Sequence, residues 1–433
     1  MHLKEEADMF TTRRTFLGAT SASAALLALA GCGLSGSSNK ANEKAAKEAA
    51  EGEIKGEISF QTWSLKNEKF TPYFEDLVKK FQEKHPGTTV KWMDQPGEGY
   101  QDKLLAQANS DSLPDVVNVP PNFAYALAKA GMLLDLAKAD PKLNEVYVEG
   151  GVKAYQMPEI EGSFGYPWYL GTDMNWWNLA ELSKFGVDEG SLPKSFDEMY
   201  DLAMKIAKDG GKTPLFSTMP QLKITTEGGK FNFNTEENVQ YLQKHVDLYK
   251  AGAMPAEVLN NDYTGNAALF KQGKVLWTTA TSSFAGDLKN DAPKILEGTA
   301  VTPKYDTPPL FVQGISVSAK SKNPATALAF AKFATDTANQ IAFVTLAQGF
   351  LPGTKEAAAD PSKFAEKSDI ELQNKAVTIA SESMKTATDT TNVLWTDDMN
   401  TNLTQQMAKA MRGDITAKEA LDNAVKYGND NLA

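Results

Sequence analysis

Strand and helix signals alternate from residue 58 onward, and this alternation limits the fold more than any other feature of the chain. Apolar and polar residues alternate over residues 58–62, as in a strand with one buried face. Apolar residues over 70–81 recur at helical spacing, and Pro86-Gly87 ends that helix before a second strand at residues 88–93. This strand–helix–strand order predicts a parallel sheet that is covered by helices on both faces.

The same pattern continues to the C-terminus, where helix-start signals are clear. Ser195 and Glu198 have the spacing of a capping box in front of a helix that we expect to end near Gly210. Thr416 and Glu419 repeat this spacing in front of the last helix. No internal repeat of fixed period is present, so the pattern predicts an α/β protein rather than a repeat array. The 433 residues are enough for two domains or one large one.

The first 31 residues have the features of an export signal. Arg13-Arg14 is a twin-arginine pair, residues 19–30 are apolar and rich in alanine, and Gly31-Cys32 completes a sequence that looks like a lipobox. The apolar run is shorter than the roughly 20 residues that a membrane-spanning helix needs, which is typical of a cleaved signal. We therefore expect residues 1–31 to be removed. Cys32, the only cysteine, is then expected to carry acyl chains that hold the protein to the outer face of a membrane.

Residues 32–54 separate the predicted lipid site from the first strand. Glycine and serine are frequent up to residue 38, and alanine, lysine and glutamate dominate after it. This composition predicts a tether that is flexible at first and partly helical afterwards. Such a tether lets the folded body stand off the membrane.

The chain is acidic, and its mature part is almost free of arginine. The net charge is -11, and removal of residues 1–31 takes away three basic and three acidic residues, which leaves this value unchanged. An acidic surface argues against nucleic acid as a partner. Arg412 is the only arginine after residue 31, although arginine is the usual bidentate partner of phosphate and carboxylate. A neutral ligand is therefore favoured.

Seven short motifs occur in an order that is typical of one protein family. They are Ile58-Ser59-Phe60-Gln61-Thr62-Trp63, Phe81 to Pro86-Gly87, Leu113-Pro114-Asp115-Val116-Val117, Tyr166-Pro167 followed by Trp176-Trp177-Asn178, Leu192-Pro193 to Glu198, Phe270 to Gly273-Lys274, and Gly413 to Thr416 with Glu419-Ala420-Leu421. From about residue 57 to the end, the chain resembles the family 1 extracellular solute-binding proteins, the maltose-binding-protein-like carbohydrate-binding components of ABC importers. The tryptophans at 176 and 177 replace the tyrosines that are commoner there.

The resemblance implies a type II periplasmic-binding-protein-like fold. Two α/β lobes, each a mainly parallel sheet flanked by helices, would be joined by a hinge, with the ligand in the cleft between them. The chain would cross between lobes near residues 166–169, 299–304 and 350–354. Lobe one would comprise residues 55–167 and 300–350, and lobe two residues 168–299 and 351–433. Closure of the lobes would remove water from the ligand and create the surface that the permease reads.

Aromatic residues at predicted strand ends and crossings are the first candidates for ligand contacts. The C–H faces of a sugar stack on aromatic rings, and its hydroxyls need donors and acceptors that are already positioned. Trp63 ends the first strand, where open α/β sheets bind ligands, although a core position is the alternative interpretation. The resemblance adds Phe284 and Trp395, because the family often places stacking aromatics in those loops.

Three further aromatic candidates lie around the predicted hinge. Trp168 and Tyr169 are at the first predicted crossing, and Trp177 follows shortly after it. Trp176 and Trp177 are sequence neighbours and cannot face the same side of a strand, so we expect one of the two to be buried. The sequence does not decide which of them faces the cleft.

Four polar residues complete the predicted binding set, and Glu98 and Tyr100 are weaker candidates. The four are Gln61, Asp115, Asn122 and Gln313. Asn122 has the alternative role of a helix N-cap, and Asp115 that of a hydrogen-bond acceptor in a turn. Gly314, beside Gln313, indicates either a close backbone approach or a bulge.

An enzyme is one alternative interpretation. A surface glycoside hydrolase would need two carboxylates that face each other across a cleft, and 55 acidic residues do not exclude such a pair. No nucleophile elbow, P-loop or dinucleotide fingerprint is present, however. His85 and His245 also lack a partner at metal-ligand spacing. We therefore expect a protein without catalytic residues, metal or cofactor.

A binding protein for another solute is the second alternative. A polyamine site would need an acidic, aromatic-lined cleft, which the composition allows, whereas the lone Arg412 disfavours glycerol phosphate. The expected partners are a small carbohydrate, the permease subunits of an importer, and the membrane through Cys32. The protein is expected to act outside the cytoplasm as a monomer.

Overall fold

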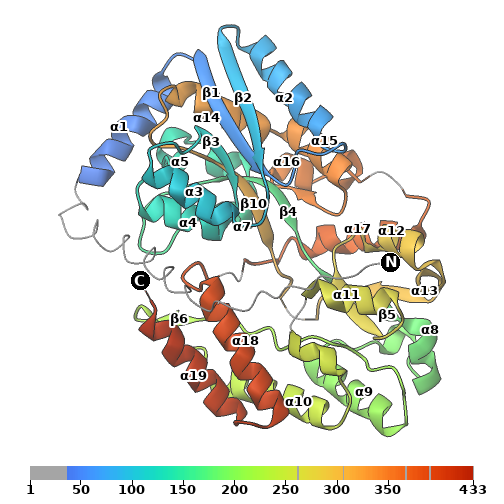
Figure 1. Ribbon diagram of the computed structural model, residues 1–433. Coiled ribbons are helices and arrows are strands. Elements are labelled where there is room, and N and C mark those ends of the chain that lie inside the picture. Colours follow the sequence, from blue (N-terminus) through green and yellow to red (C-terminus); the bar gives the residue numbers. More distant parts are fainter. Residues whose placement is uncertain (1–36, 261–262, 306, 366–367, 390–391, 433) are drawn as a thin grey trace, which may run out of the picture.

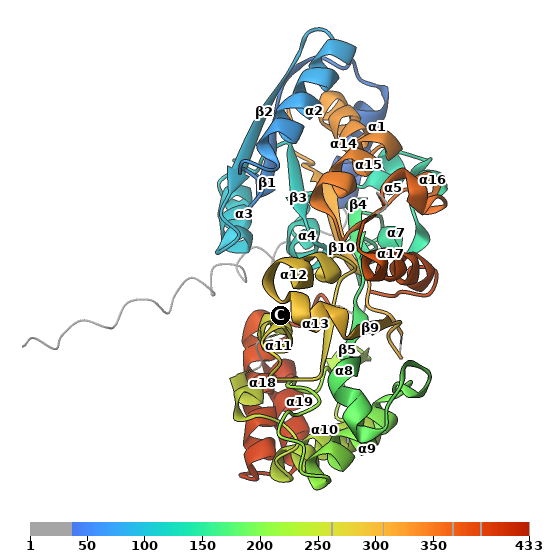
Figure 2. The same cartoon turned by 90° about the vertical axis from the view of Figure 1, so that its right-hand side faces the viewer.

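The computed structural model describes residues 37–260, 263–305, 307–365, 368–389 and 392–432. The predicted export signal and Cys32 lie outside these residues. Two bodies of secondary structure follow each other along the long axis of the molecule (Figures 1 and 2). We name the upper body in Figure 1 lobe one and the lower body lobe two. Within the described residues, no helix is both long and apolar enough to span a bilayer.

Lobe one is built on a six-stranded sheet. Its strands, in spatial order, are β11 (Leu351–Pro352), β4 (Tyr166–Gly171), β10 (Phe311–Val317), β3 (Val116–Val119), β1 (Gly56–Trp63) and β2 (Thr88–Gln95). β1 pairs in parallel with β2 and β3, which confirms the predicted strand–helix–strand start. β10 returns from lobe two and lies antiparallel between β3 and β4.

Helices cover both faces of this sheet. They are α2 (Thr71–Lys84), α3 (Tyr100–Asn109), α4 (Pro121–Lys129), α5 (Leu136–Ala139), α6 (Leu143–Val146), α7 (Glu149–Ala154), α14 (Pro324–Ala334), α15 (Thr337–Ala347) and α16 (Lys355–Ala358). α2 shows why the sequence folds this way, because Phe74, Leu77 and Phe81 form its buried stripe at helical spacing. The Phe74 ring lies 6.1 Å from the ring of Phe60 on β1.

The segment expected to be a tether contains a helix that packs on lobe one. α1 (Ser37–Glu51) contacts α14 and α5, and Ala46 and Ala49 are buried in that contact. The side chain of Asn42 donates to the carbonyl of Leu133 at 2.9 Å and accepts from the backbone N–H of Asp135 at 2.9 Å. Residues 37–51 therefore form the helical part that the composition predicted, and this helix packs on lobe one, because alanines at helical spacing allow a close approach.

Asn42→Ala is expected to lower the free energy of unfolding by about 1–2 kcal/mol, because it removes both hydrogen bonds and leaves the buried Asp135 N–H without an acceptor. Urea unfolding checks the size of the effect. Hydrogen exchange should show loss of protection concentrated in α1. Glu48→Ala, on the exposed face of the same helix, is the control and should change neither measurement.

Lobe two contains a three-stranded sheet in the order β8 (Trp277–Ala280), β5 (Met174–Asn178) and β9 (Thr299–Thr302). β5 pairs antiparallel with both neighbours, so this sheet differs from the mainly parallel one that we expected. The reason is local connectivity. β5 begins just after the first crossing and leads away from lobe one, whereas β9 ends just before the second crossing and leads back to it, so the two neighbours run in opposite directions. A small hairpin, β6 (Thr226–Glu227) with β7 (Lys230–Phe231), lies apart from it.

The helices of lobe two lie on both sides of its sheet. They are α8 (Leu179–Leu182), α9 (Phe196–Lys208), α10 (Glu236–Lys250), α11 (Tyr263–Lys271), α12 (Phe284–Asp291), α13 (Pro293–Glu297), α17 (Glu371–Ser383), α18 (Asp397–Arg412) and α19 (Ala417–Asp430). The predicted capping box is complete at Thr416 and Glu419. At Ser195 only half of it forms, because the Glu198 carboxylate accepts from the backbone N–H of Lys194 instead.

Three segments connect the lobes. The first is Thr172-Asp173, between β4 and β5, and the second is residues 303–310, between β9 and β10. The third crossing lies further along the chain than residues 350–354, where we expected it. Residues up to Phe364 still contact lobe one, because β11 pairs with β4 and the Phe364 carbonyl accepts a hydrogen bond from the Thr345 hydroxyl of α15. The chain joins lobe two with α17, which packs on β9.

Candidate functional site at the inner edge of lobe one

The edge of the lobe-one sheet that faces lobe two collects several predicted site residues. The chain leaves lobe one at the C-terminal end of β4, and β3 and β1 run in the same direction as β4. The C-terminal ends of these strands therefore lie at one edge, together with the start of antiparallel β10 (Figure 1). Trp63, Asn118, Tyr169 and Gln313 stand at this edge. Open α/β sheets bind their ligands outside such strand ends.

Trp63 is the centre of this edge. Its side chain is half-buried, and its ring stacks on the ring of Tyr100 with a centroid distance of 5.7 Å and an interplanar angle of 23°. The Tyr100 hydroxyl donates to the carbonyl of Asn118 at 3.1 Å, and burial raises the pKa of this tyrosine above its ordinary value. Gly97 lies under the indole, since a Cβ there would come within 3.2 Å of it. Trp63 is thus held on one face while part of its ring stays accessible.

Two residues of this edge have a buried polar atom without a partner in the described part of the chain. Within the described residues, neither the Trp63 Nε1 nor the Asn118 Oδ1 has a hydrogen-bond partner. The same holds for the Trp168 Nε1 on β4 and for the Thr172 Oγ1 on the first crossing. Buried polar atoms in native proteins are nearly always paired, so the unpaired Trp63 Nε1 and Asn118 Oδ1 at the strand ends indicate partners from outside the chain, whereas the Trp168 Nε1 lies in the core of lobe one.

The amides of this edge are pre-oriented by one another. The Asn118 Nδ2 donates to the carbonyl of Gly314 at 3.0 Å and to the Oε1 of Gln313 at 3.3 Å. Gln313 is half-buried, and the pairing register shifts between it and Gly314. A Cβ on Gly314 would lie 2.3 Å from the Tyr155 hydroxyl, so this glycine makes room for Tyr155.

Gln61 and Asn122 have different surroundings. Gln61 is fully buried and exchanges two amide hydrogen bonds of 3.1 Å with Gln107, so it supports the site from behind. Asn122 lies in the first turn of α4, after β3, and is half-buried. It does not cap the helix, and its side chain makes no hydrogen bond within the described residues. Its amide is therefore available to a ligand.

Asp115 lies at the wrong end of β3 for the role that we expected. It precedes the strand, and its carboxylate accepts from the Ser59 N–H at 2.8 Å, the Ser59 hydroxyl at 2.7 Å and the Ser321 hydroxyl at 2.6 Å. All of these contacts join segments within lobe one. Asp115 is therefore a structural residue, as its alternative interpretation as an acceptor in a turn suggested.

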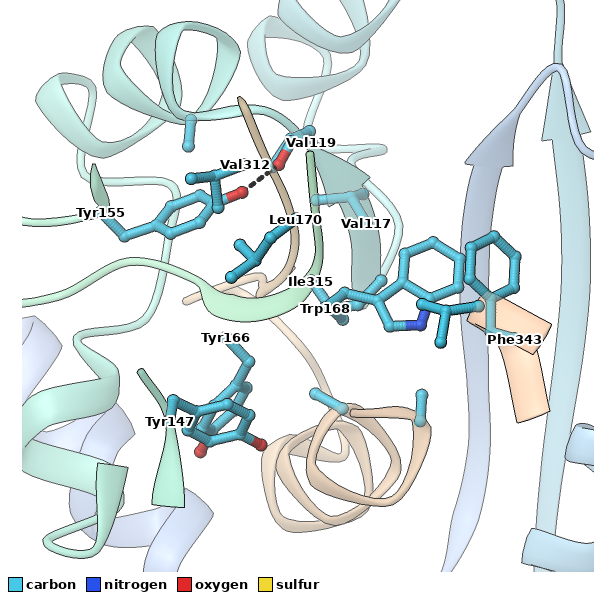
Figure 3. Packing of buried hydrophobic residues seen from close by; sticks show 14 of the residues in the cluster. Val117, Val119, Tyr147, Tyr155, Tyr166, Trp168, Leu170, Val312, Ile315 and Phe343 are labelled. Atoms are coloured by element: carbon cyan, nitrogen blue, oxygen red, sulfur yellow. Dashed lines mark hydrogen bonds between the residues drawn. The ribbon is translucent and has the colours of Figure 1, made fainter. Parts of the chain in front are cut away.

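The two hinge aromatics differ in exposure. Figure 3 shows the indole of Trp168 beside the ring of Phe343, and their centroids are 4.3 Å apart. Trp168 is 1% exposed, so it belongs to the core of lobe one. Tyr169 is half-buried and packs on Phe343 and Phe350 at 5.1 and 4.9 Å, while burial raises the pKa of its hydroxyl. Of the two, only Tyr169 can present part of its ring to a ligand.

Both tryptophans of β5 are buried, which corrects the expectation that one of them faces a cleft. Trp176 packs against Phe284 at 5.3 Å, and its Nε1 donates to the Ala280 carbonyl. Trp177 points to the other face of the sheet, where its Nε1 donates to the Thr302 hydroxyl at 2.8 Å. Helices cover both faces of this sheet, so alternation along the strand does not produce an exposed side. Phe284 is also buried, with 4% exposed, and has a packing role.

Trp395 is the predicted aromatic that stays half-exposed in lobe two. It lies in the loop before α18, and its ring packs edge-on against Phe231 at 5.0 Å and Phe233 at 5.1 Å. A Cβ on Gly428 would come within 2.7 Å of the indole, so this glycine seats the ring. The buried Nε1 has no hydrogen-bond partner within the described residues. Trp395 therefore resembles Trp63 in having a fixed ring and an unused donor.

Sequence reasoning missed Asn118 and ranked Tyr100 too low. Asn118 is a lone amide inside the apolar run Val116-Val117-Asn118-Val119, and this interruption of a fully buried strand was the available signal. Within the described residues, no three or more His, Cys, Asp and Glu side chains are grouped to hold a metal ion. The edge is therefore rich in amides and aromatic rings, and its named residues carry no charge.

A buried carboxyl lies on the first crossing. Asp173 is 5% exposed, and burial raises its pKa from 3.8 to about 6, although the ammonium group of Lys304 on the second crossing acts in the opposite direction. Between pH 4 and 6 the unfolded chain loses this proton while the folded protein keeps it. The contribution of the Asp173 carboxyl to the free energy of unfolding is therefore complete below about pH 4 and is lost as the pH rises through 6.

Asp173→Asn is expected to stabilise the protein at pH 7 by roughly 1–2 kcal/mol, because the amide need not lose a proton in a buried place. The difference between variant and wild type should shrink toward pH 4. Thermal unfolding at several pH values measures it. The quantity to follow is the difference in stability between variant and wild type at each pH. The stability of either protein alone also falls in acid, because burial lowers the pKa of His245 to about 4, and this effect cancels in the difference. A constant difference from pH 4 to 7 would contradict this account of Asp173.

Comparison with known proteins agrees with this architecture. Residues 76–374 match the family model described as bacterial extracellular solute-binding protein, which is more than half of the chain. The chain belongs to this family. Its members and the solved structures of this fold are solute-binding proteins rather than enzymes, and they act outside the cytoplasm.

Individual relatives are distant. The Escherichia coli protein YcjN, by name an ABC transporter periplasmic-binding protein, is 23% identical over 200 residues, which are 41% of this chain and 45% of YcjN. The match thus spans less than half of that relative. The sn-glycerol-3-phosphate-binding protein UgpB of Brucella abortus is 24% identical over 72% of this chain and 75% of its own length. A crystal structure from Synechococcus sp. MITs9220, titled as an oligosaccharide periplasmic-binding protein in complex with zinc, has a TM-score of 0.74. It is 25% identical, over 87% of this chain and 98% of its own.

Proposed function

We propose that this protein is the substrate-binding component of an ABC sugar importer and that it captures a neutral mono- or oligosaccharide between its two lobes. The observation that carries the proposal is the inner edge of lobe one, where a fixed indole and an unpaired amide oxygen lie at the strand ends nearest lobe two. Rings and neutral amides suit the C–H faces and hydroxyls of a sugar. The oligosaccharide named for the Synechococcus structure supports this ligand class.

We assign the ligand contacts to half-exposed residues of both lobes. Lobe one supplies Trp63, Asn122, Gln313 and Tyr169, with Asn118 behind them, and lobe two supplies Trp395. The five residues that the structure buries or turns away are not part of this set: Gln61, Asp115, Trp168, Trp177 and Phe284. Delivery to a permease follows from closure of the lobes around the ligand, and the protein acts as a monomer.

Glycerol phosphate is the second candidate ligand, because UgpB matches over most of both chains. A phosphate dianion needs strong donors, and arginine is the usual one. The only arginine after residue 31 is Arg412, which pairs with Asp414 at 3.0 Å at the end of α18. This arrangement favours the neutral sugar.

A thermal-shift screen of mono-, di- and oligosaccharides against sn-glycerol 3-phosphate and spermidine tests the ligand class. A sugar should raise the melting temperature in a concentration-dependent way, and it should remain chemically unchanged after incubation. A shift with only the charged solutes would overturn the proposal, and conversion of the sugar to a product would favour the hydrolase.

The membrane anchor is a separate part of the proposal. Cys32→Ser is expected to release the exported protein from the membrane fraction, since it removes the only thiol that can carry acyl chains. Fractionation and intact mass of the purified protein check this, with the wild type expected to carry the added mass of acyl groups. An unmodified Cys32 in a membrane-bound protein would contradict the anchor without affecting the ligand assignment.

A further inference from the structure

Helix α1 is fastened to lobe one at both of its ends. Near its start, the side chain of Asn42 bonds to the backbone of Leu133 and of Asp135, each at 2.9 Å. Just beyond its end, the Thr326 hydroxyl of α14 accepts from the Lys55 N–H at 2.9 Å and donates to the Lys55 carbonyl at 2.7 Å. Between these points the helix packs on α14 and α5. α1 is therefore a part of lobe one.

Small residues make this contact close. Ala46 and Ala49 are 2% and 4% exposed, although the helix lies on the outside of the lobe. Gly52 continues the contact, because a Cβ there would come within 3.0 Å of the Ala325 Cβ on α14. A larger side chain at these positions would push the helix away from α14. The fit is therefore specific to alanine and glycine.

The chain between the predicted lipid site and α1 is short. Only residues 33–36 separate Cys32 from Ser37, the first residue of α1. A chain of this length spans at most roughly 18 Å. If α1 were released from the lobe, residues 33–55 would separate Cys32 from β1, and that chain spans roughly 80 Å when it is extended. The docked helix therefore shortens the reach of the folded body about fourfold.

The exposed face of α1 has no excess of positive charge. Residues 42–51 include two lysines and three glutamates. Lys44 and Lys47 each pair with the glutamate four positions later, at 3.6 and 4.0 Å, and Lys138 of α5 pairs with Glu43 at 3.4 Å. Anionic lipid surfaces attract clusters of unpaired lysine and arginine. The length of the connecting chain, rather than attraction to lipid, is thus what can hold this face near a bilayer.

From this geometry we propose that α1 makes lobe one the membrane-proximal lobe and that the surface around the first half of α1 and the end of α4 faces the bilayer. This inference rests on the lipid anchor at Cys32, which is part of the proposed function. The anchor by itself leaves the position of the body open over the full length of the chain. Docking of α1 fixes which lobe stays beside the membrane, and lobe two then moves against it when the lobes close.

The composition of the chain allows each lobe to be labelled at one place. Cys32 is the only cysteine, and its thiol carries the lipid in the proposed anchor, so an introduced cysteine is the only free thiol. Ala130→Cys places a dye at the exposed end of α4, three residues before the Leu133 carbonyl that binds Asn42. Lys208→Cys places it at the exposed end of α9, in the lower part of lobe two (Figure 1).

The test is energy transfer from each dye to acceptor lipids, with the acylated protein inserted into phosphatidylcholine vesicles. We expect more transfer from Ala130→Cys than from Lys208→Cys. Ala46→Glu, added to Ala130→Cys, forces a charge into the buried contact with α14. It should lower transfer about twofold or more, because the reach of the chain grows about fourfold, and should expose the α1 amides to hydrogen exchange. Ala50→Glu makes the same change at an exposed position of the helix and should alter neither.

A longer connecting chain provides a second variant, which leaves α1 intact. About twenty glycine and serine residues inserted after Gly36 should lower transfer from Ala130→Cys while the α1 amides stay protected. Equal transfer from the two dyes in the wild type, or unchanged transfer after the insertion or after Ala46→Glu, would overturn the proposal. A rise in transfer when phosphatidylglycerol is added would do the same, because charge would then set the position. Failure of the anchor itself differs: the protein would not join the vesicles, while the α1 amides would remain protected.

Discussion

Trp63→Ala is expected to weaken sugar binding about thirtyfold or more, which corresponds to roughly 2 kcal/mol of lost stacking and burial. The indole is fixed against Tyr100 on one face and presents the rest of its ring at the inner edge of lobe one. Its Nε1 is also an unused donor. Isothermal titration calorimetry with the sugar that the screen identifies measures the effect.

Two tryptophan-to-phenylalanine variants provide the controls, one at Trp63 itself and one at a core tryptophan. Trp63→Phe keeps a ring but loses the Nε1 donor, so it should weaken binding less than the alanine variant does. Trp177→Phe should lower the melting temperature, because Trp177 is fully buried and bonded to Thr302, but it should leave the affinity unchanged. If Trp63→Ala binds the sugar as tightly as the wild type, Trp63 is a packing residue and the site lies elsewhere.

Asp115→Ala should have the opposite pattern, with a large loss of stability and no loss of affinity. The substitution removes acceptors for the Ser59 N–H, the Ser59 hydroxyl and the Ser321 hydroxyl. Hydrogen bonds to a charged group contribute about 1.5–3 kcal/mol each, and they are not additive, so we expect a loss of about 3 kcal/mol. Chemical unfolding measures it, and calorimetry at a temperature where the variant is folded gives the affinity.

A nearby aspartate makes the comparison specific. Asp111 is exposed, and within the described residues its carboxylate pairs with Lys320. Its backbone is left-handed, with φ of 52°, so the suitable control is Asp111→Asn, which tolerates that conformation and should leave the unfolding midpoint nearly unchanged. A mild effect of Asp115→Ala on stability, together with weaker sugar binding, would restore Asp115 to the ligand site and contradict its structural role.

The local structure of lobe one could be predicted because its signals are local. The stripe of Phe74, Leu77 and Phe81 and the alternation in β1 depend only on residues within each element. The antiparallel sheet of lobe two could not be predicted in this way. Its strand directions depend on where the chain crosses between lobes, and no single strand carries that information.

The candidate site was predicted less well for a related reason. Aromatic residues near strand ends were the correct class, but exposure decides among them, and exposure depends on helices from distant parts of the sequence. Phe284 and Trp177 are covered by such helices, whereas Trp63 and Trp395 are not fully covered. Asp115 was misplaced because it precedes β3, whereas β1, β3 and β4 present their C-terminal ends to lobe two.

The central claim is that two lobes close around a neutral sugar without changing it chemically. Small-angle X-ray scattering of the mature protein, with and without the sugar at saturating concentration, tests this claim most directly. The account predicts a smaller radius of gyration with the sugar, the same change in Trp63→Ala only at about thirtyfold higher sugar concentration, and recovery of the intact sugar afterwards. Identical scattering with and without a bound sugar, or recovery of a cleaved product, would contradict it.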